Sequence, residues 1–313
     1  MNRFLIVISA VSSFVIAIII VYVVIAIRQP IHIVPSGFNF AAVGDWGCNS
    51  NTHDTVNNIL SKKPQLVLGL GDYSYSSTAD CWIQMVEPIE DKIKIAIGNH
   101  DDRLGGEGRV TNGKLQEYMD HFDLKEQYYS FDYHKIHFII LSTELAYKAD
   151  SPQYEFVKND LSKAASDPNI DWIIVCFHIQ MYASQSKHGV LPALASIYHP
   201  LFDKYRVDLV LQAHNHNYER TYPIKFNINS PSNPIITSTN KNTYADHEGE
   251  IFATVGTGGQ SLYPFKNKQD YFVKQYVGFG ILDIDLSKDE KTLTGKFYTN
   301  NDKIIDQFTI THK

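Results

Sequence analysis

The sequence predicts an α/β fold made of two packed mixed β-sheets flanked by helices, a four-layer sandwich, with a transmembrane helix at its N-terminus. Three observations support this prediction. Residues 4–27 form one apolar run that contains no charged residue. Strand-like apolar segments alternate with helical spacing from residue 38 to about residue 216, and from residue 251 onward strand-like segments follow one another directly. The alternation is typical of βαβ units and the later succession of antiparallel strands, so two sheets packed face to face accommodate both.

The apolar run at the N-terminus is long enough to span a bilayer, which takes about 20 residues. Arg28-Gln29-Pro30 follows it instead of a small-residue cleavage site, which favours an uncleaved signal anchor over a cleaved signal peptide. We expect residues 1–28 to be this anchor, residues 29–37 to be a linker, and residues 38–313 to form one folded domain. The domain is then membrane-anchored and extracytoplasmic, or secreted if the N-terminal segment is cleaved.

Five short apolar segments in the first two thirds of the domain are expected to be strands: residues 38–43, 66–70, 93–97, 172–177 and 207–211. Each ends at a polar side chain, in most cases beside a glycine. Helical spacing of apolar residues occurs at residues 52–61, 81–90, 114–122, 152–165 and 191–205. Residues 128–133 and 136–141 are expected to form a hairpin, and residues 103–113 and 226–249 to be loops. Four further strands are expected at residues 251–255, 278–286, 292–298 and 303–309.

The composition limits the classes of partner and cofactor. The formal net charge is −6 and no basic run is present, so we expect no nucleic-acid partner. The three cysteines have no zinc-binding spacing. Cys176 lies inside an apolar strand and is expected to be buried. Cys48 and Cys81 each follow a polar loop, and their pairing is left open.

The polar residues at the five strand ends form a set of metal-ligand types. In an open α/β sheet, binding sites lie beyond the carboxyl ends of the strands, so these residues are expected to converge. Carboxylates can bridge two cations, and imidazoles favour iron, zinc or manganese. Seven donors exceed one tetrahedral zinc ion and suit two ions, and a phenolate favours a hard trivalent ion. The candidate metal ligands are Asp45, Asp72, Tyr75, Asn99, His178, His214 and His216.

Each of these residues alone has an ordinary structural interpretation. Asp45 beside a glycine can be a turn former, and Tyr75 can be a packed aromatic residue. The two histidines at 214 and 216 can belong to a solvated loop. Five strand ends that all carry such residues in one chain are hard to explain by composition, and we therefore favour the metal site.

These motifs resemble the five blocks of the metallophosphoesterases and, within them, the purple acid phosphatases. The blocks are GDxG, GDxxY, GNH(D/E), VxxH and GHxH, and residues 44–47, 71–75, 98–101 and 175–178 match the first four. His214-Asn215-His216 matches the fifth, but Ala213 replaces its glycine, which puts the geometry of that loop in doubt. Tyr75 distinguishes the purple acid phosphatases from other metallophosphoesterases. Residues 217–223 resemble the plant and bacterial branch, whereas the length resembles the small mammalian-type, tartrate-resistant branch.

The resemblance implies the metallophosphoesterase fold and a dinuclear centre. By motif, Asp45, Asp72, Tyr75 and His216 would hold Fe(III). Asp72, Asn99, His178 and His214 would hold a divalent ion, which in this family is iron, zinc or manganese, so that Asp72 bridges the two.

The activity that the resemblance implies is hydrolysis of phosphate monoesters at acidic pH, with a metal-activated hydroxide attacking phosphorus in line. His100 is the first candidate for stabilising the transition state or delivering a proton, and Asp101 is expected to orient its ring. His188 resembles a histidine that assists the centre in the mammalian-type enzymes; its ordinary alternative is an exposed loop residue. The substrate would be a small phosphate ester or a phosphoprotein.

Two alternative functions stay open at this point. One is a phosphodiesterase or nucleotidase with the same two metals, since the loops around the site do not reveal the substrate. The other belongs to a different class: a non-catalytic binding module, tethered to the membrane, on a phosphatase fold. The complete set of ligands argues against that module, because a decayed site is expected to lose some of them.

Overall fold

The computed structural model of the chain describes residues 36–102 and 112–312. The expected membrane anchor at residues 1–28 and most of the expected linker and of the 103–113 loop lie outside these ranges. Within the described ranges, no helix has the length and apolar character needed to cross a membrane. From Ser36 onward the chain forms one compact unit.

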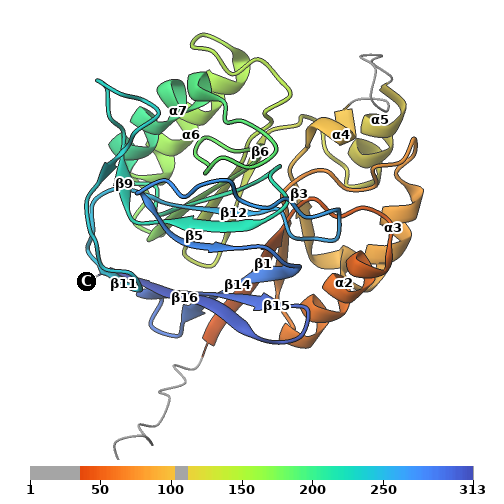
Figure 1. Ribbon diagram of the computed structural model, residues 1–313. Helices are drawn as coiled ribbons and strands as arrows, with labels where there is room; N and C mark the ends of the chain where they lie inside the picture. The colour runs from red at the N-terminus through yellow and green to blue at the C-terminus, as the bar shows by residue number, and fades with distance from the viewer. Residues whose placement is uncertain (1–35, 103–111, 313) are drawn as a thin grey trace, which may run out of the picture. The chain divides into compact units, whose positions relative to one another are not determined.

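Two seven-stranded sheets form the centre of this unit, as predicted (Figure 1). The first sheet has the order β11-β16-β15-β14-β1-β2-β3, and the second has the order β13-β8-β12-β7-β6-β5-β4. The strands of the first sheet are β1 (Ser36–Val43), β2 (Leu66–Gly69), β3 (Ile93–Ile95), β11 (Thr243–Ala245), β14 (Gly280–Ser287), β15 (Thr292–Thr299) and β16 (Ile304–Thr311). Those of the second are β4 (Tyr129–Tyr133), β5 (Ile136–Ile140), β6 (Trp172–Ile179), β7 (Leu209–Ala213), β8 (Tyr218–Thr221), β12 (Ile251–Val255) and β13 (Phe272–Tyr276). A short ribbon joins β9 (Ile224–Lys225) to β10 (Ile235–Ile236).

Both sheets are mixed. In the first, β1, β2 and β3 are parallel, whereas β14, β15 and β16 form antiparallel pairs and β14 joins β1 in antiparallel fashion. In the second, β5, β6, β7 and β12 are parallel. The parallel strands include the five that were expected to carry the polar residues, namely β1, β2, β3, β6 and β7. The carboxyl ends of the parallel strands lie at one edge of each sheet.

The side chains of β1 show which layer lies on each side of the first sheet. Phe40 meets Phe138 of β5 edge-on, with ring centroids 5.3 Å apart, so this face packs on the second sheet. Asn39 points the other way, because side chains alternate along a strand, and its amide donates to the Lys62 carbonyl at the end of α2 (3.2 Å). The helix α2 (Ser50–Lys62) therefore covers the outer face of the first sheet.

The outer face of the second sheet carries its own apolar core beneath two helices, α6 (Pro152–Ala164) and α7 (Pro192–Tyr205). Val157 and Phe202 from these helices are buried with Val175 and Val210 from the sheet. The described residues also contain the helices α3 (Asp80–Val86), the 3₁₀ helix η1 (Glu87–Lys92), α4 (Asn99–Asp102) and α5 (Asn112–His121). The layer order of helix, sheet, sheet and helix confirms the predicted sandwich.

Four elements, β8, β9, β13 and α4, have no counterpart among the expected segments. All four residues of β8 are buried between β12 and β13, so β8 lacks the alternation of apolar and polar residues that marks a half-exposed strand. The expected 226–249 loop also contains β10 and β11. These short strands depend on their neighbours more than on their own sequence.

A disulfide joins Cys48, in the loop after β1, to Cys81 at the start of α3. The sequence left this pairing open. The third cysteine, Cys176, is buried in β6 as expected.

Candidate metal centre

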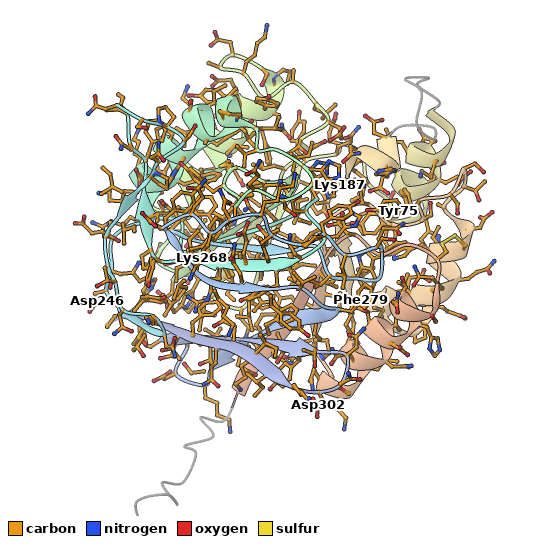
Figure 2. The ribbon with its side chains drawn as sticks, viewed as in Figure 1. Tyr75, Lys187, Asp246, Lys268, Phe279 and Asp302 are labelled. Carbon is orange, nitrogen blue, oxygen red and sulfur yellow. A yellow bond between two sulfur atoms is a disulfide. The ribbon has the colours of Figure 1, made fainter. Side chains whose placement is uncertain are left out.

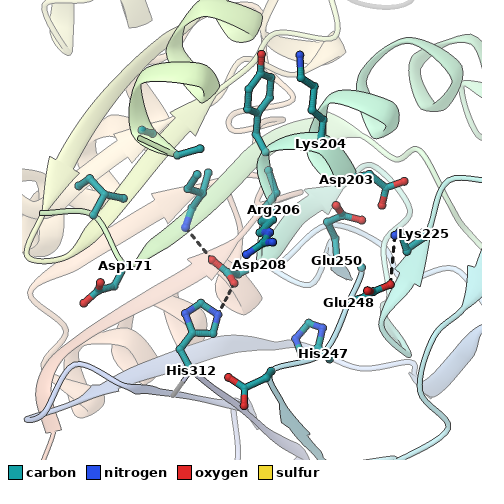
Figure 3. Close-up of a pocket in the computed structure, with 18 residues that line it drawn as sticks. Asp171, Asp203, Lys204, Arg206, Asp208, Lys225, His247, Glu248, Glu250 and His312 are labelled. Atoms are coloured by element: carbon teal, nitrogen blue, oxygen red, sulfur yellow. Dashed lines mark hydrogen bonds and ion pairs between the residues drawn. The ribbon is translucent and has the colours of Figure 1, made fainter. Parts of the chain in front are cut away.

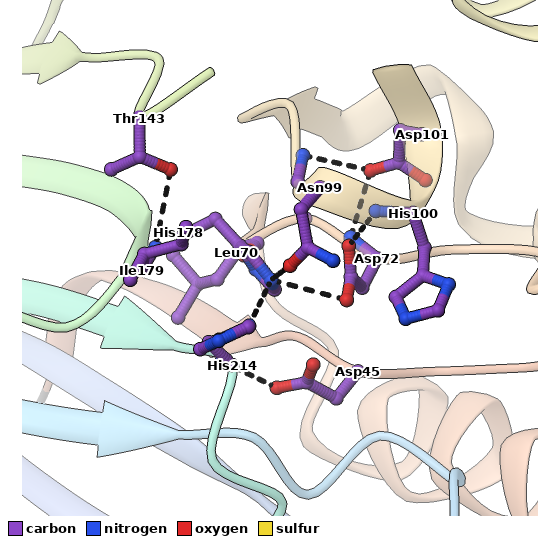
Figure 4. A network of polar contacts seen from close by, with 12 residues as sticks. Asp45, Leu70, Asp72, Asn99, His100, Asp101, Thr143, His178, Ile179 and His214 are labelled. Atoms are coloured by element: carbon purple, nitrogen blue, oxygen red, sulfur yellow. Dashed lines mark hydrogen bonds and ion pairs between the residues drawn. The ribbon is translucent and has the colours of Figure 1, made fainter. Parts of the chain in front are cut away.

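The seven predicted ligands meet where the carboxyl ends of the two sheets' parallel strands approach each other. Figure 4 shows five of them, Asp45, Asp72, Asn99, His178 and His214, and Figure 2 labels Tyr75. Val43, Gly69 and Ile95 are paired in register across β1, β2 and β3, so the loops that follow these strands begin at one level. The backbone N–H of His214, after β7, donates to Asp45 Oδ2 of the first sheet (2.8 Å). Residues far apart in the sequence thus come to one edge of the fold.

Four of these residues form a first cluster around the hydroxyl of Tyr75. This oxygen lies 3.0 Å from Asp45 Oδ1, 3.2 Å from Asp72 Oδ2 and 3.0 Å from His216 Nε2. His216 Nε2 is also 3.4 Å from Asp45 Oδ1. The members of this cluster are the residues that the family resemblance assigns to the ferric ion.

Four residues form a second cluster around Nε2 of His178 (Figure 4). This nitrogen lies 3.1 Å from Asp72 Oδ2, 3.2 Å from Asn99 Oδ1 and 3.2 Å from His214 Nδ1. Asp72 Oδ2 belongs to both clusters, which is the arrangement expected of a bridging carboxylate.

Backbone carbonyls orient two of the imidazoles. His178 Nδ1 lies 2.8 Å from the carbonyl oxygen of Leu70, and His216 Nδ1 lies 2.6 Å from that of Ser261. A carbonyl can only accept, so each Nδ1 carries a proton and donates it. When the ring is neutral, its Nε2 atom therefore carries no proton. The lone pair of Nε2 points into the cluster, as metal-binding histidines require.

The donor chemistry of both clusters fits metal cations. The Tyr75 hydroxyl has one proton but faces two carboxylate oxygens and the lone pair of His216, so at most one of the three receives it. His178 Nε2 likewise carries at most one proton and faces three ligand-type atoms. Lone pairs that converge on one point without enough hydrogens are satisfied by a cation.

The electrostatics agree with this interpretation. Burial, reinforced by the carboxylates of Asp45 and Asp72, raises the pKa of the Tyr75 phenol well above its ordinary value. A phenolate ligand at that position therefore requires a nearby cation. Burial opposes the protonated form of His178, but the charge of Asp72 raises its pKa to about 10. A metal ion in the second cluster would replace that proton.

Four of the seven candidate ligands have left-handed backbone: Asp45, Asp72, Tyr75 and His214, with φ between 51° and 71°. Such residues cost about 1–3 kcal/mol each and concentrate at functional sites. The remainder of the fold holds these loops in place, since Gly98 packs so closely on Asp72 that a Cβ would lie 2.3 Å from its Oδ1. The left-handed conformation directs these four polar side chains into the site at the strand ends.

The exchange of Ala213 for glycine in the fifth block leaves the loop geometry intact. Ala213 is the buried last residue of β7, and the left-handed residue is His214 instead. The methyl group of Ala213 lies over Gly44, where an added Cβ would approach it to 2.7 Å. Glycine is thus needed at position 44, whereas alanine is tolerated at position 213.

The two histidines predicted to assist catalysis lie beside different ligands of the centre. The His100 ring is 4.4 Å from that of Tyr75, and its backbone N–H donates to Asp72 Oδ1 (2.7 Å). The His188 ring is 4.3 Å from that of His214. Burial lowers the pKa of both His100 and His188, and the charge of Lys187 adds to this effect at His188.

The prediction that Asp101 orients the His100 ring is wrong. Asp101 is fully buried, and its two carboxylate oxygens accept backbone N–H groups from Asp72 (2.7 Å), Tyr73 (2.9 Å) and Gly98 (2.9 Å). Burial and the charge of Asp72 raise its pKa to about 7. Asp101 instead joins the loops of the second and third blocks, a role that the motif spacing does not reveal.

Two residues that the sequence did not single out support the fifth block. The Asn215 amide forms reciprocal hydrogen bonds with the backbone of His188, accepting from its N–H (3.0 Å) and donating to its carbonyl (3.3 Å). The Tyr263 ring stacks on His216 at 4.0 Å, and its hydroxyl accepts from Lys187 Nζ (2.9 Å). No local signal marks either residue, because both contacts join distant segments.

Comparison with protein families gives a match over residues 38–218 to the model described as calcineurin-like phosphoesterase. Among curated proteins, the chain is similar to purple acid phosphatase 15 of Arabidopsis thaliana, with 26% identity over 72% of this chain and 46% of that protein. It is also 30% identical to purple acid phosphatase 22 of the same plant, over 72% of this chain and 51% of that protein. The chain spans about half the length of these curated relatives.

Among solved structures, a purple acid phosphatase from yellow lupin (Lupinus luteus) seeds has a similar fold, with a TM-score of 0.75. The similarity covers 88% of this chain and 54% of the lupin chain at 24% sequence identity. At that identity the likeness concerns the fold.

Proposed function

The chain belongs to the calcineurin-like phosphoesterase family, and we propose that it hydrolyses phosphate monoesters at acidic pH with a dinuclear metal centre. The observation that carries this proposal is the pair of donor clusters that share Asp72 Oδ2. At most one proton at the centre of each cluster faces three ligand-type atoms, a pattern that two adjacent cations would satisfy.

The proposed ligand sets follow the two clusters. Asp45, Asp72, Tyr75 and His216 would hold Fe(III), because a phenolate oxygen and two carboxylates suit a hard trivalent ion. Asp72, Asn99, His178 and His214 would hold a divalent iron, zinc or manganese ion. When bound, the two ions supply Lewis-acid polarisation of the ester and a strong nucleophile at low pH.

The chain's own residues supply the remaining parts of the proposed reaction. Asn215 holds the His188 backbone so that its ring stays beside His214, and the exposed ring of His100 lies next to Tyr75. One ring can hydrogen-bond a phosphate oxygen while the other gives a proton to the departing alkoxide. The similarity to proteins named as purple acid phosphatases supports a monoester of a small molecule or phosphoprotein as substrate.

Metal analysis combined with ester hydrolysis tests this proposal. Purified protein is expected to contain iron and to hydrolyse an aryl phosphate monoester faster at acidic than at neutral pH, and faster than the matching diester. A faster diester reaction would favour the phosphodiesterase alternative. Full metal occupancy without turnover of either ester would favour the non-catalytic module.

We also propose that the enzyme is anchored in a membrane by residues 4–27 and that its catalytic domain, residues 38–313, is extracytoplasmic. The Cys48–Cys81 disulfide supports this location, since disulfides persist in oxidising compartments. Deletion of residues 1–30 is expected to move the active enzyme from the membrane fraction to the soluble fraction. An enzyme that is already soluble with these residues retained would contradict the anchor.

A further inference from the structure

A polar cavity lies at the amino-terminal edge of the second sheet, away from the candidate metal centre. It has a volume of about 790 Å³ (Figure 3). Its walls include Asp171, Asp208 and Glu250, the residues that directly precede β6, β7 and β12. Those strands are parallel and the candidate centre follows the carboxyl ends of β6 and β7, so this cavity occupies the opposite edge.

Three side chains of ligand type lie together beside this cavity: Asp203 and Glu250 line it, and the buried His199 contacts Glu250. His199 and Asp203 are four residues apart on α7 and therefore share one face of the helix, and Glu250 faces them from the start of β12. His199 Nε2 lies 2.8 Å from Glu250 Oε2 and 4.0 Å from Asp203 Oδ1. One atom from each residue falls within 4.8 Å of the other two.

No basic side chain balances the two carboxylates of this group, and burial raises the pKa of Glu250 well above its ordinary value. Glu250 is 1% exposed and His199 is fully buried. Within residues 36–102 and 112–312, no lysine or arginine lies within ion-pair distance of Asp203 or Glu250; Lys225 pairs with Glu248 instead (3.3 Å). Two carboxylates and a histidine without a basic partner are costly to bury.

The free ligand atom of Asp203 supports this interpretation. Asp203 Oδ1 is buried and has no hydrogen-bond partner among the described residues. In a folded protein such atoms are usually satisfied, so Asp203 Oδ1 indicates a ligand at this group.

Neighbouring groups fix the orientation of the ligand atoms. The Tyr182 hydroxyl contacts His199 Nδ1 at 2.7 Å, and the Phe226 N–H donates to Asp203 Oδ2 at 2.9 Å. These contacts leave His199 Nε2 and Asp203 Oδ1 directed at the same space as Glu250. Two ligand atoms on one tetrahedral zinc ion lie about 3.4 Å apart, and the observed 2.8 and 4.0 Å bracket that value.

We propose that His199, Asp203 and Glu250 bind one divalent transition-metal ion, zinc or manganese. One imidazole and two carboxylates are the ligands that these ions prefer over calcium or magnesium. The ion joins helix α7 to strand β12 and balances the buried carboxylates. This site is separate from the proposed catalytic centre and does not depend on its function.

Metal counting with a matched pair of variants tests the site. Full-length protein is stripped with a chelator, reloaded with zinc and analysed for bound zinc per chain. Glu250→Gln keeps the shape of the side chain and an acceptor for His199 but removes the charge, and it is expected to bind one ion fewer than wild type. Glu248→Gln removes a carboxylate of the same cavity outside the trio and is expected to keep the wild-type count. Asp203→Asn, at a partly exposed position, should repeat the loss if Glu250→Gln does not fold.

A crystal structure of the zinc-loaded wild-type chain decides the location directly. The expected result is an anomalous peak between His199 Nε2, Asp203 Oδ1 and Glu250. Zinc peaks confined to the Asp72 clusters, or equal zinc counts in Glu250→Gln, Asp203→Asn and Glu248→Gln, would overturn the proposal. The trio would then be a buried hydrogen-bonded group that only fastens α7 to the sheet.

Discussion

Two polar clusters of this protein are comparably buried but differ in how their donors and acceptors are matched. Around Arg220, each donor meets an acceptor: Nε and Nη2 donate to the two oxygens of Asp306 (2.7 and 3.0 Å), and Nη1 donates to Tyr244 (2.8 Å). Around Tyr75 and His178, lone pairs outnumber hydrogens. The first cluster is complete without a ligand, whereas the second would be completed by the proposed cations.

The match between donors and acceptors separates structural from functional polar clusters in this fold. Arg220 of β8 and Asp306 of β16 join the two sheets, so the matched cluster is expected to determine stability. The unmatched cluster lies on strained backbone at the strand ends and is expected to determine activity. Variants of each cluster test whether this division holds.

Asp72→Asn is expected to lower kcat/KM several-thousandfold, about 5 kcal/mol of transition-state stabilisation, because the shared carboxylate serves both clusters. Asn99→Ala, which touches only the second cluster, should cost less. Steady-state kinetics of the two folded variants on an aryl phosphate give the order. The reverse order would mean that Asp72 does not bridge the two ions.

Arg220→Met is expected to destabilise the protein by about 3–5 kcal/mol, because it leaves Asp306 buried without its partner. Urea unfolding measures this loss, and the folded fraction should keep its metal content. Lys225→Met is the control, since its ion pair with Glu248 is exposed and worth little. Similar losses in both variants would contradict the role given to the matched cluster.

His137 offers a pH-dependent test of a second matched cluster. Its ring lies 2.6 Å from Asp132 and 2.9 Å from Asp160. Burial disfavours the imidazolium, but the two carboxylates raise its pKa above the ordinary value. Because the folded-state pKa is raised, this stabilisation is fully present below about pH 6.5, the unfolded value, and is lost as pH rises through the folded-state pKa.

His137→Asn should therefore cost about 1–3 kcal/mol of unfolding free energy at acidic pH and less at alkaline pH. Urea unfolding at several pH values measures the difference. A cost that does not change with pH would show that the ring is uncharged and that its packing alone matters.

Asn215→Ala has the smallest expected effect, about a tenfold fall in kcat, because it frees the backbone of His188 without removing a ligand. KM and the bound metal should stay close to wild type. Asn217→Ala, which loses contacts to Ser186 and Tyr263 rather than to His188, is the matched control. Loss of metal in Asn215→Ala would assign the residue to the ligand loop instead.

Much of the fold and of the candidate site could be predicted because both depend on local patterns. Apolar segments followed by Asp45, Asp72 and His178 mark strand ends by themselves, and parallel strands bring their ends to one edge. Asp101 could not be interpreted correctly, since its partners are backbone amides of two different loops. The disulfide of Cys48 depends likewise on how helix α3 packs, which the spacing of cysteines does not encode.

The strand β8 shows a second limit of local patterns. Its residues carry no alternation, because neighbouring strands and the Arg220 cluster bury all of them. The trio of His199, Asp203 and Glu250 was missed for a similar reason, since α7 and β12 supply it from widely separated segments. Side chains that meet only through tertiary packing leave no spacing to recognise.

The visible absorption spectrum of the iron-loaded protein and of its Tyr75→Phe variant tests directly whether Tyr75 binds Fe(III) in a functional metal centre. A phenolate on Fe(III) absorbs visible light by charge transfer, so the wild type is expected to be violet to pink. Tyr75→Phe keeps the ring that stacks near His100 but removes the oxygen that faces Asp45, Asp72 and His216. We expect the colour to vanish in Tyr75→Phe while the fold and iron content are retained. A colourless wild-type protein with full iron occupancy, or a variant that keeps the colour, would contradict this role of Tyr75.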